Sequence, residues 1–402
     1  MKVITYRITL LEPTLVTAMD GDPNSAVAFS YLPGSVLRGA AIGKYLREHG
    51  GALDAANADA RRLFLNGATR YLNGYLLDRD GTRTLPTPQS WQREKGEETP
   101  LYDFAVYELP EDVKVQWQVI GGSEPHRTRF CRLTDDSVRL IQPDRLITVH
   151  TARTRRFGRA MPKNIIRDDE SPGAVYRYDA LAPGQSFAAA VVCDNDADAA
   201  TLLPLLTGEA TLGGSRSGGY GRVKLEEAEK KTNWREAPGG LEPGTDGKLI
   251  ITLLSDALLR DGNGQFTVDP EVVRAVMETQ LEVTAGTLGK LQAFLRGQTI
   301  GGFNRKWGLP LPQALAVQMG SVFVFDKPTC SESKLKELEA HGIGERRAEG
   351  FGRVAVNWHT NPKLSVDATN PSTPPALALV PETDSGKLAR RNGGAHAAAA
   401  VG

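Results

Sequence analysis

The sequence predicts an α+β protein made of two similar halves, and three observations support this prediction. A block of the form Gly-aromatic-Gly-Arg-Val occurs twice, as Gly219–Val223 and as Gly350–Val354. The similarity extends upstream at the same offset of 131 residues, because Arg216 aligns with Arg347. Each block also follows a strand pattern and a helix pattern and leads into an alternating strand pattern. The 402 residues are enough for two or three domains of ordinary size.

The elements of the first half can be placed in order. Alternation of apolar residues predicts an opening strand over Val3–Leu10. Ser35 suits an N-cap, and the apolar residues after it form a helical stripe. A strand is expected over Phe187–Cys193, a helix over about Ala197–Leu206, and a closing strand from Val223.

The second half repeats this order. Strands are expected over Leu249–Leu254 and Val322–Phe325, a helix over Lys334–Ala340, and a closing strand over Val354–Trp358. Both halves therefore fit a β-α-β-β-α-β plan, which is ferredoxin-like.

The domain boundaries follow from composition. We expect a first domain over residues 1–231 with insertions at about 78–130 and 150–175, a Pro- and Gly-rich linker over 232–247, and a second domain over 248–360. Residues 361–402 are rich in Pro, Ala, Gly, Thr and Asn, a composition that cannot bury a core, so they are expected to be a disordered tail.

Composition excludes several classes of protein. Three dispersed cysteines disfavour a disulfide framework and a zinc site, and no apolar run is as long as a membrane span. We expect a cytoplasmic protein with no metal and no cofactor. The 48 basic and 48 acidic residues balance, but basic residues gather between Arg153 and Arg167, where no acidic residue occurs.

The two Gly blocks are the strongest candidates for binding an anion. Closely spaced glycines let the backbone turn sharply, arginines grip phosphate, and an aromatic ring packs or stacks on a base. The candidate residues are Gly213, Gly214, Ser215, Arg216, Ser217, Gly218, Gly219, Tyr220, Gly221 and Arg222 in the first loop, and Arg346, Arg347, Gly350, Phe351, Gly352 and Arg353 in the second. Since the blocks follow helices and lead into strands, they do not form a dinucleotide-binding fingerprint.

Three further segments carry candidate RNA-binding residues. The basic segment with His150 fits a mobile arm on a nucleic-acid backbone, or alternatively a solvated face. Arg38, near the start of the first helix, completes an anion site or belongs to a well-started helix. A glycine- and aromatic-rich loop near residue 300 contacts RNA or forms a tight structural turn. The residues are His150, Arg153, Arg155, Arg156, Arg159, Lys163, Arg38, Gly301, Gly302, Phe303, Asn304 and Lys306.

Signs of catalysis are sparse. The six histidines show no metal-binding spacing, and no phosphate-binding loop of the P-loop type or nucleophile elbow occurs. Asp20 and Asp22 lie in a loop where they could assist RNA cleavage, although Asp-Gly-Asp is more commonly a turn.

These motifs together resemble the RAMP (repeat-associated mysterious protein) superfamily of CRISPR-Cas systems. The Gly loops and the segment Leu32-Pro33-Gly34-Ser35-Val36-Leu37-Arg38-Gly39 are similar to the motifs of that superfamily. The segments Leu85–Pro88, His150–Ala160, Gly301–Asn304 and Gly308–Pro312 look like the large double-RAMP subunit of type III-D complexes.

The resemblance implies a non-catalytic subunit that binds CRISPR RNA near its 5′ handle in an antiviral ribonucleoprotein. The implied partners are the polymerase-like large subunit, the backbone RAMP subunits and, indirectly, target RNA. Two alternatives stay open: an endoribonuclease that cuts guide precursor or target RNA through Asp20 or Asp22, and a protein whose Gly loops dock only protein neighbours.

Overall fold

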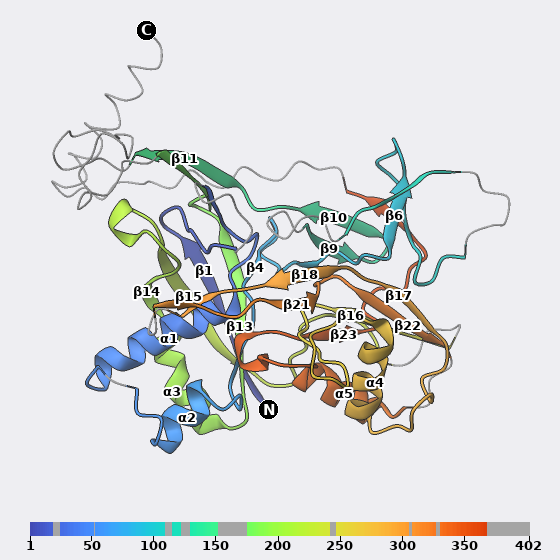
Figure 1. The fold of residues 1–402 in the computed structure, drawn as a ribbon. Coiled ribbons are helices and arrows are strands. Elements are labelled where there is room, and N and C mark those ends of the chain that lie inside the picture. Colours follow the sequence, from blue (N-terminus) through green and yellow to red (C-terminus); the bar gives the residue numbers. More distant parts are fainter. Residues whose placement is uncertain are drawn as a thin grey trace, which may run out of the picture.

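Two antiparallel sheets, each covered by helices on one face, form the two halves of the chain (Figure 1). The structure is a computed structural model that describes residues 1–18, 25–51, 53–108, 115–121, 129–151, 175–241, 247–304, 308–326 and 330–367. Helices α1, α2 and α3 lie beneath the first sheet, and α4 and α5 beneath the second (Figure 1).

The first sheet has the strand order β14-β15-β1-β13-β3, with β4 also paired to β13. The helices that pack on it are α1 (Gly34–Glu48), α2 (Ala58–Phe64) and α3 (Asp196–Leu202). The strands are β1 (Lys2–Leu10), β3 (Arg70–Tyr71), β4 (Tyr75–Leu76), β13 (Ser186–Cys193), β14 (Gly208–Thr211) and β15 (Arg222–Lys231). The first strand is central, and its alternate residues Ile4, Tyr6, Ile8 and Leu10 are buried in the core between the sheet and the helices. This arrangement is the expected ferredoxin-like one, with β14 added at the edge.

The second sheet has the strand order β17-β22-β16-β23 and two helices, α4 (Pro270–Leu281) and α5 (Glu332–His341). Its strands are β16 (Lys248–Leu253), β17 (Leu291–Phe294), β22 (Val322–Asp326) and β23 (Val354–Val356). Five of the six residues of β16 are buried, because both faces of this sheet are covered. The α+β class with two ferredoxin-like halves is therefore confirmed.

A third sheet, which the sequence did not predict, covers the other face of the second half. It has the order β5-β9-β10-β24-β7-β6-β8 and draws most of its strands from the first insertion. The strands are β5 (Leu85–Pro86), β6 (Trp91–Glu94), β7 (Leu101–Asp103), β8 (Trp117–Val119), β9 (Phe130–Thr134), β10 (Ser137–Ile141) and β24 (Lys363–Val366). Trp91 and Leu101 pack there with Leu254 and Trp358 in one buried cluster.

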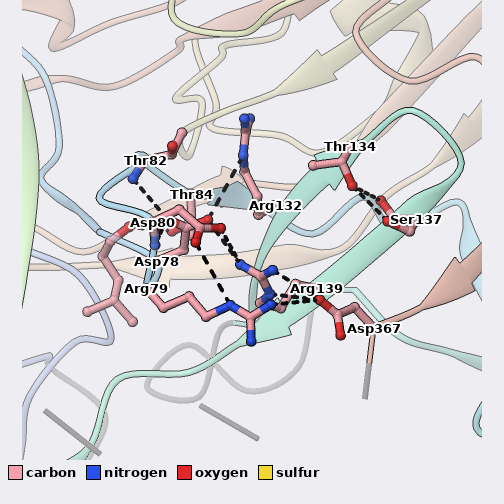
Figure 2. Close-up of polar contacts among 11 residues, drawn as sticks. Asp78, Arg79, Asp80, Thr82, Thr84, Arg132, Thr134, Ser137, Arg139 and Asp367 are labelled. Atoms are coloured by element: carbon pink, nitrogen blue, oxygen red, sulfur yellow. Dashed lines mark hydrogen bonds and ion pairs between the residues drawn. The ribbon is translucent and has the colours of Figure 1, made fainter. Parts of the chain in front are cut away.

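Strand β24 corrects the expected start of the tail at residue 361. Lys363 and Leu364 pair with β7, and Ser365 and Val366 pair with β10. A charge network fixes this segment, since Arg139 of β10 lies 3.0 Å from both Asp80 and Asp367 (Figure 2). Ordered structure therefore continues beyond residue 360, because the insertion supplies strands with which this segment pairs.

Two smaller sheets complete the described fold. The hairpin of β11 (Arg145–Thr151) and β12 (Val175–Leu181) pairs with β2 (Ser25–Val27) and extends above the first sheet (Figure 1). In the second half β18 (Gly297–Ile300) pairs with β21 (Ala314–Val317), and β19 (Phe303–Asn304) pairs with β20 (Leu309–Pro310).

Part of the segment expected to be a linker is packed between the halves. Glu236 is 3% exposed and lies 2.7 Å from Arg83 of the insertion and 2.9 Å from Arg353 of the second Gly loop. A buried carboxylate with two arginine partners therefore joins three separate parts of the chain.

Candidate nucleic-acid interface

The two Gly loops have the same backbone conformation. Left-handed residues occur at matched positions in both, with φ of 77° and 73° at Gly213 and Gly344, and 81° and 86° at Gly219 and Gly350. Ser215 and Arg346 match as well, with φ of 57° and 54°. The sequence repeat is therefore also a repeat of local structure, and alternating left- and right-handed residues can turn successive N–H groups toward an anion.

Contacts with the backbone explain why glycine is required in these loops. The N–H of Gly221 donates to the Pro13 carbonyl (2.9 Å), and that of Gly352 donates to the Asp256 carbonyl (2.8 Å). A Cβ on Gly221 would lie 2.2 Å from the Leu212 carbonyl oxygen, and one on Gly352 would lie 1.8 Å from that of Ile343. Each loop is thus held against the segment that follows the first strand of its own half.

The second loop is docked on the first half of the chain. A Cβ on Gly350 would lie 2.6 Å from the Tyr71 carbonyl oxygen, and Glu349 accepts a hydrogen bond from Arg38 (2.9 Å). Arg346 pairs with the same carboxylate and lies over the ring of Phe351. The 3₁₀ turn Arg347–Glu349 thus belongs to the contact between the halves.

The structure corrects two predicted phosphate contacts, at Arg353 and Arg38, and the predicted helix N-cap at Ser35. Arg353 is 5% exposed and pairs with Glu236, so its guanidinium is occupied within the protein. The anion that Arg38 binds is the carboxylate of Glu349. Ser35 is not the N-cap, because α1 begins at Gly34, whose N–H donates to the Asn73 side-chain oxygen (2.8 Å).

The first loop, in contrast, is open. Arg216, Ser217, Gly218 and Gly219 are all exposed, and Arg216 makes no side-chain hydrogen bond or ion pair with any residue that the structure describes. Arg222 is 50% exposed and has a loose ion pair with Glu12 (3.6 Å). The same backbone therefore presents two cations to solvent in one half and is covered in the other.

Tyr220 of the first loop does not stack on bases, which corrects that reading of the aromatic position. Its ring is 4% exposed, and its hydroxyl is within hydrogen-bond distance of Thr148 and of Nε2 of His150 (2.9 Å). The ring instead anchors the loop beneath the β11–β12 hairpin, where it meets Tyr178 edge-on.

The hairpin adds two tyrosines that sequence reasoning missed. His150 pairs across the strands with Tyr176, and their rings are nearly parallel at a centroid distance of 5.4 Å. Tyr178 lies between this pair and Tyr220. Partial burial and the neighbouring Tyr178 raise the pKa of Tyr176. The alternation Tyr176-x-Tyr178 in a strand was the signal that could have identified a shared aromatic face.

Several predicted residues lie outside the described part of the chain. These are Asp20, Asp22, Arg153, Arg155, Arg156, Arg159, Lys163 and Lys306. The basic segment joins β11 to β12, so it leaves and re-enters the fold beside His150 and Tyr176. Phe303 and Asn304 form the short strand β19, next to Gly301 and Gly302, and RNA contact there stays a prediction.

The described residues offer little for catalysis. His359 contacts Asp103 (2.6 Å) and Thr252 (2.7 Å), an arrangement like a catalytic triad, but His359 is 1% exposed. It joins the insertion sheet to β16 and has no access to a substrate. Among the described residues no cluster of His, Cys, Asp and Glu could hold a metal ion, and no helix could span a membrane.

Comparison with known proteins assigns the chain to a family. The CRISPR-associated protein family Cas_Cmr3 matches residues 152–358, slightly more than half of the chain. The chain belongs to the Cas_Cmr3 family. This match confirms the expected RAMP subunit of a type III CRISPR effector complex, which is a structural subunit that binds RNA. The narrower resemblance to type III-D subunits stays a prediction.

Three solved structures illustrate a distant similarity to this Cas_Cmr3 protein. A type III-B Cmr-beta complex bound to cognate target RNA and AMPPnP contains a chain with a TM-score of 0.40 and 12% identity, over 81% of this chain and 86% of that one. A Cas6-related protein from Pyrococcus furiosus gives 0.38 and 9%, over 88% and 97%. The CRISPR-associated protein Cas6 gives 0.37 and 11%, over 88% and 98%. No curated protein matches the sequence.

Proposed function

We propose that this Cas_Cmr3 protein holds CRISPR RNA on the face formed by the first Gly loop and the β11–β12 hairpin, near the 5′ handle of the guide. Arg216 and Arg222 contact phosphates, and the half-buried rings of His150 and Tyr176 carry a base. The basic segment from Arg153 to Lys163 adds further phosphate contacts where it leaves the hairpin.

One observation supports this proposal above the others: two loops with one backbone conformation differ in what covers them. In the second loop Arg346 pairs with Glu349 and Arg353 with Glu236, and Arg347, the counterpart of Arg216, is half-buried. The first loop leaves Arg216 exposed and Arg222 only loosely paired, beside an aromatic cluster. Exposed arginines next to stacked rings are the combination by which proteins bind single-stranded nucleic acid.

The test is RNA affinity as a function of salt concentration. Arg216→Ala combined with Arg222→Ala removes two phosphate contacts, so affinity for guide RNA is expected to fall roughly 10- to 100-fold. The slope of log affinity against log salt is expected to become shallower by about 1.4, since each single-strand contact contributes about 0.7.

A matched double variant provides the control. Arg93→Ala with Lys336→Ala removes the same charge from β6 and from α5, neither of which belongs to the first Gly loop or to the β11–β12 hairpin. Unchanged slope and affinity in the Arg216 and Arg222 variant would refute RNA binding by this loop. Labelled RNA recovered intact from the same samples separates holding RNA from the alternative, cleavage through Asp20 or Asp22.

The partners within the effector complex follow from the proposal. The polymerase-like large subunit and the backbone RAMP subunits are the expected neighbours, and the cytoplasm is the expected location. Crosslinking of the assembled complex, mapped to peptides, distinguishes RNA contact at the first loop from docking of a protein neighbour there.

A further inference from the structure

Arg70 in β3 is a buried cation that lacks an adequate anionic partner. Its side chain is 7% exposed, and the nearest carboxylate is that of Asp194, at 3.8 Å, which is itself 59% exposed. The Nε atom of Arg70 is buried and has no hydrogen-bond partner in the structure. A guanidinium carries five donors, and leaving them unsatisfied away from water is costly.

Other arginines of this protein show what a buried guanidinium normally receives. Five of them are less than a fifth exposed, and each lies 2.6–3.0 Å from a carboxylate oxygen; they are Arg38, Arg83, Arg139, Arg145 and Arg353. Arg70 departs from this pattern, although it is buried as deeply as Arg353. Among the described residues, Arg70 therefore lacks the close carboxylate that each of these five arginines has, since its only ion pair is the long one with Asp194.

A second arginine, Arg347, and a titratable histidine, His341, lie close enough to Arg70 to interact with it electrostatically. The 3₁₀ turn of the second Gly loop packs on β3 beside Arg70, since Gly350 approaches the Tyr71 carbonyl, and this turn carries Arg347. His341 is the last residue of α5 and is exposed. Arg347 is half-buried and makes no side-chain hydrogen bond or ion pair with a described residue.

The pKa values of Arg70 and His341 both reflect burial and neighbouring positive charge. Burial, together with the charges of Arg353 and Arg347, lowers the pKa of Arg70. Burial, together with the charges of Arg70 and Arg347, also lowers the pKa of His341. Positive charges held close together destabilise one another, and an anion between Arg70 and Arg347 would reduce that cost and favour protonation of His341.

We propose that Arg70, Arg347 and His341 form a binding site for a phosphate group at the contact between the two halves. Arginine forks match the oxygens of phosphate, and the exposed His341 leaves an approach from solvent. Arg347 is the counterpart of Arg216, so each Gly loop directs one arginine to phosphate. The phosphate is either part of an RNA backbone or a free ion, and its binding stabilises the docking of the second half on the first.

The test is thermal unfolding of the full chain with and without phosphate. Inorganic phosphate is added to a phosphate-free buffer at constant ionic strength, with chloride as the balancing anion. The midpoint of the wild-type protein is expected to rise by a similar amount with each tenfold increase of phosphate above its dissociation constant. Arg70→Met is expected to abolish this rise, and Arg93→Met, on β6, is the control that keeps it.

Arg70→Met also tests whether Arg70 binds an anion or only supports the fold. Without phosphate, Arg70→Met is expected to unfold at the same temperature as the wild type or higher, because it removes an uncompensated buried charge. A lower midpoint for Arg70→Met, together with an unchanged response to phosphate, would overturn the proposal. A second arm replaces phosphate with single-stranded RNA. If RNA stabilises the wild type through Arg70 and inorganic phosphate does not, the phosphate belongs to an RNA backbone. If inorganic phosphate stabilises the wild type through Arg70, the site binds a free ion.

Discussion

Removal of the charge on Glu236 tests how the two halves are held together. In Glu236→Gln, Arg83 and Arg353 stay buried while the carboxylate that lies 2.7 and 2.9 Å from them is gone. Breaking a buried ion pair by removing one partner costs about 3–5 kcal/mol, because the remaining charge is uncompensated. Since two arginines lose their partner here, we expect a loss of free energy of unfolding at the upper end of that range.

The assay is equilibrium unfolding in urea, followed at neutral and acidic pH. Burial alone would raise the pKa of Glu236, but the charges of Arg83 and Arg353 outweigh it, and the pKa is lowered. The ion pairs therefore contribute stability above the unfolded-state pKa, about 4.3, and lose it as the pH falls through the lower folded-state value. The difference between wild type and Glu236→Gln should thus be large at pH 7 and shrink in acid.

The control is Glu229→Gln, which breaks an exposed pair with Lys231 and should cost less than about 1 kcal/mol. Equal stability of Glu236→Gln and wild type at pH 7 would refute the reasoning. A difference that stays constant in acid would show that Glu236 acts by packing rather than by charge.

Three other predictions concern the Gly loops, the β11–β12 hairpin and a second buried carboxyl. Gly352→Ala should destabilise the protein severely, by more than about 3 kcal/mol, because its Cβ would lie 1.8 Å from the Ile343 carbonyl oxygen. Gly219→Ala places its Cβ in open space and should cost only about 1 kcal/mol of stability, for the left-handed backbone alone. Equal losses of unfolding free energy for Gly219→Ala and Gly352→Ala in urea would contradict this account. Tyr176→Ala should weaken RNA binding roughly 5- to 100-fold without changing the salt slope, while Tyr176→Phe should retain binding in the same titration. Burial raises the pKa of Asp256 to about 6, so the wild type loses stability as the pH rises from about 4 through 6. Asp256→Asn should be more stable at pH 7, by at most about 3 kcal/mol, because its amide nitrogen cannot accept from Tyr31 and Gln298. Parallel pH profiles of the wild type and Asp256→Asn would show that the carboxyl titrates normally.

Much of the fold could be predicted from residue types. The order of strands and helices in both halves follows from periodicity, and the Gly loops follow from a local requirement. Gly221 and Gly352 need left-handed backbone and have a carbonyl oxygen where a Cβ would be. Such constraints involve neighbours in sequence, so they leave a recognisable pattern in the chain.

The third sheet could not be predicted in the same way. Its β24 pairs with β10, more than 200 residues earlier in the sequence, and with β7. The strands β5, β7 and β24 are short and show no extended alternation. Their pairing depends on contacts between distant segments, which periodicity does not report.

The sequence by itself determined that this protein is duplicated, that each half ends in a glycine-rich loop, and that it resembles RAMP proteins. Only the tertiary structure decided which loop is open to a ligand. Glu349 pairs with Arg346 and Arg38, Glu236 pairs with Arg353, and Arg347 is half-buried, whereas Arg216 stays exposed in the first loop. The reason is physical: availability of a cation depends on burial and on a counter-charge, and both come from residues that folding brings together across the whole chain.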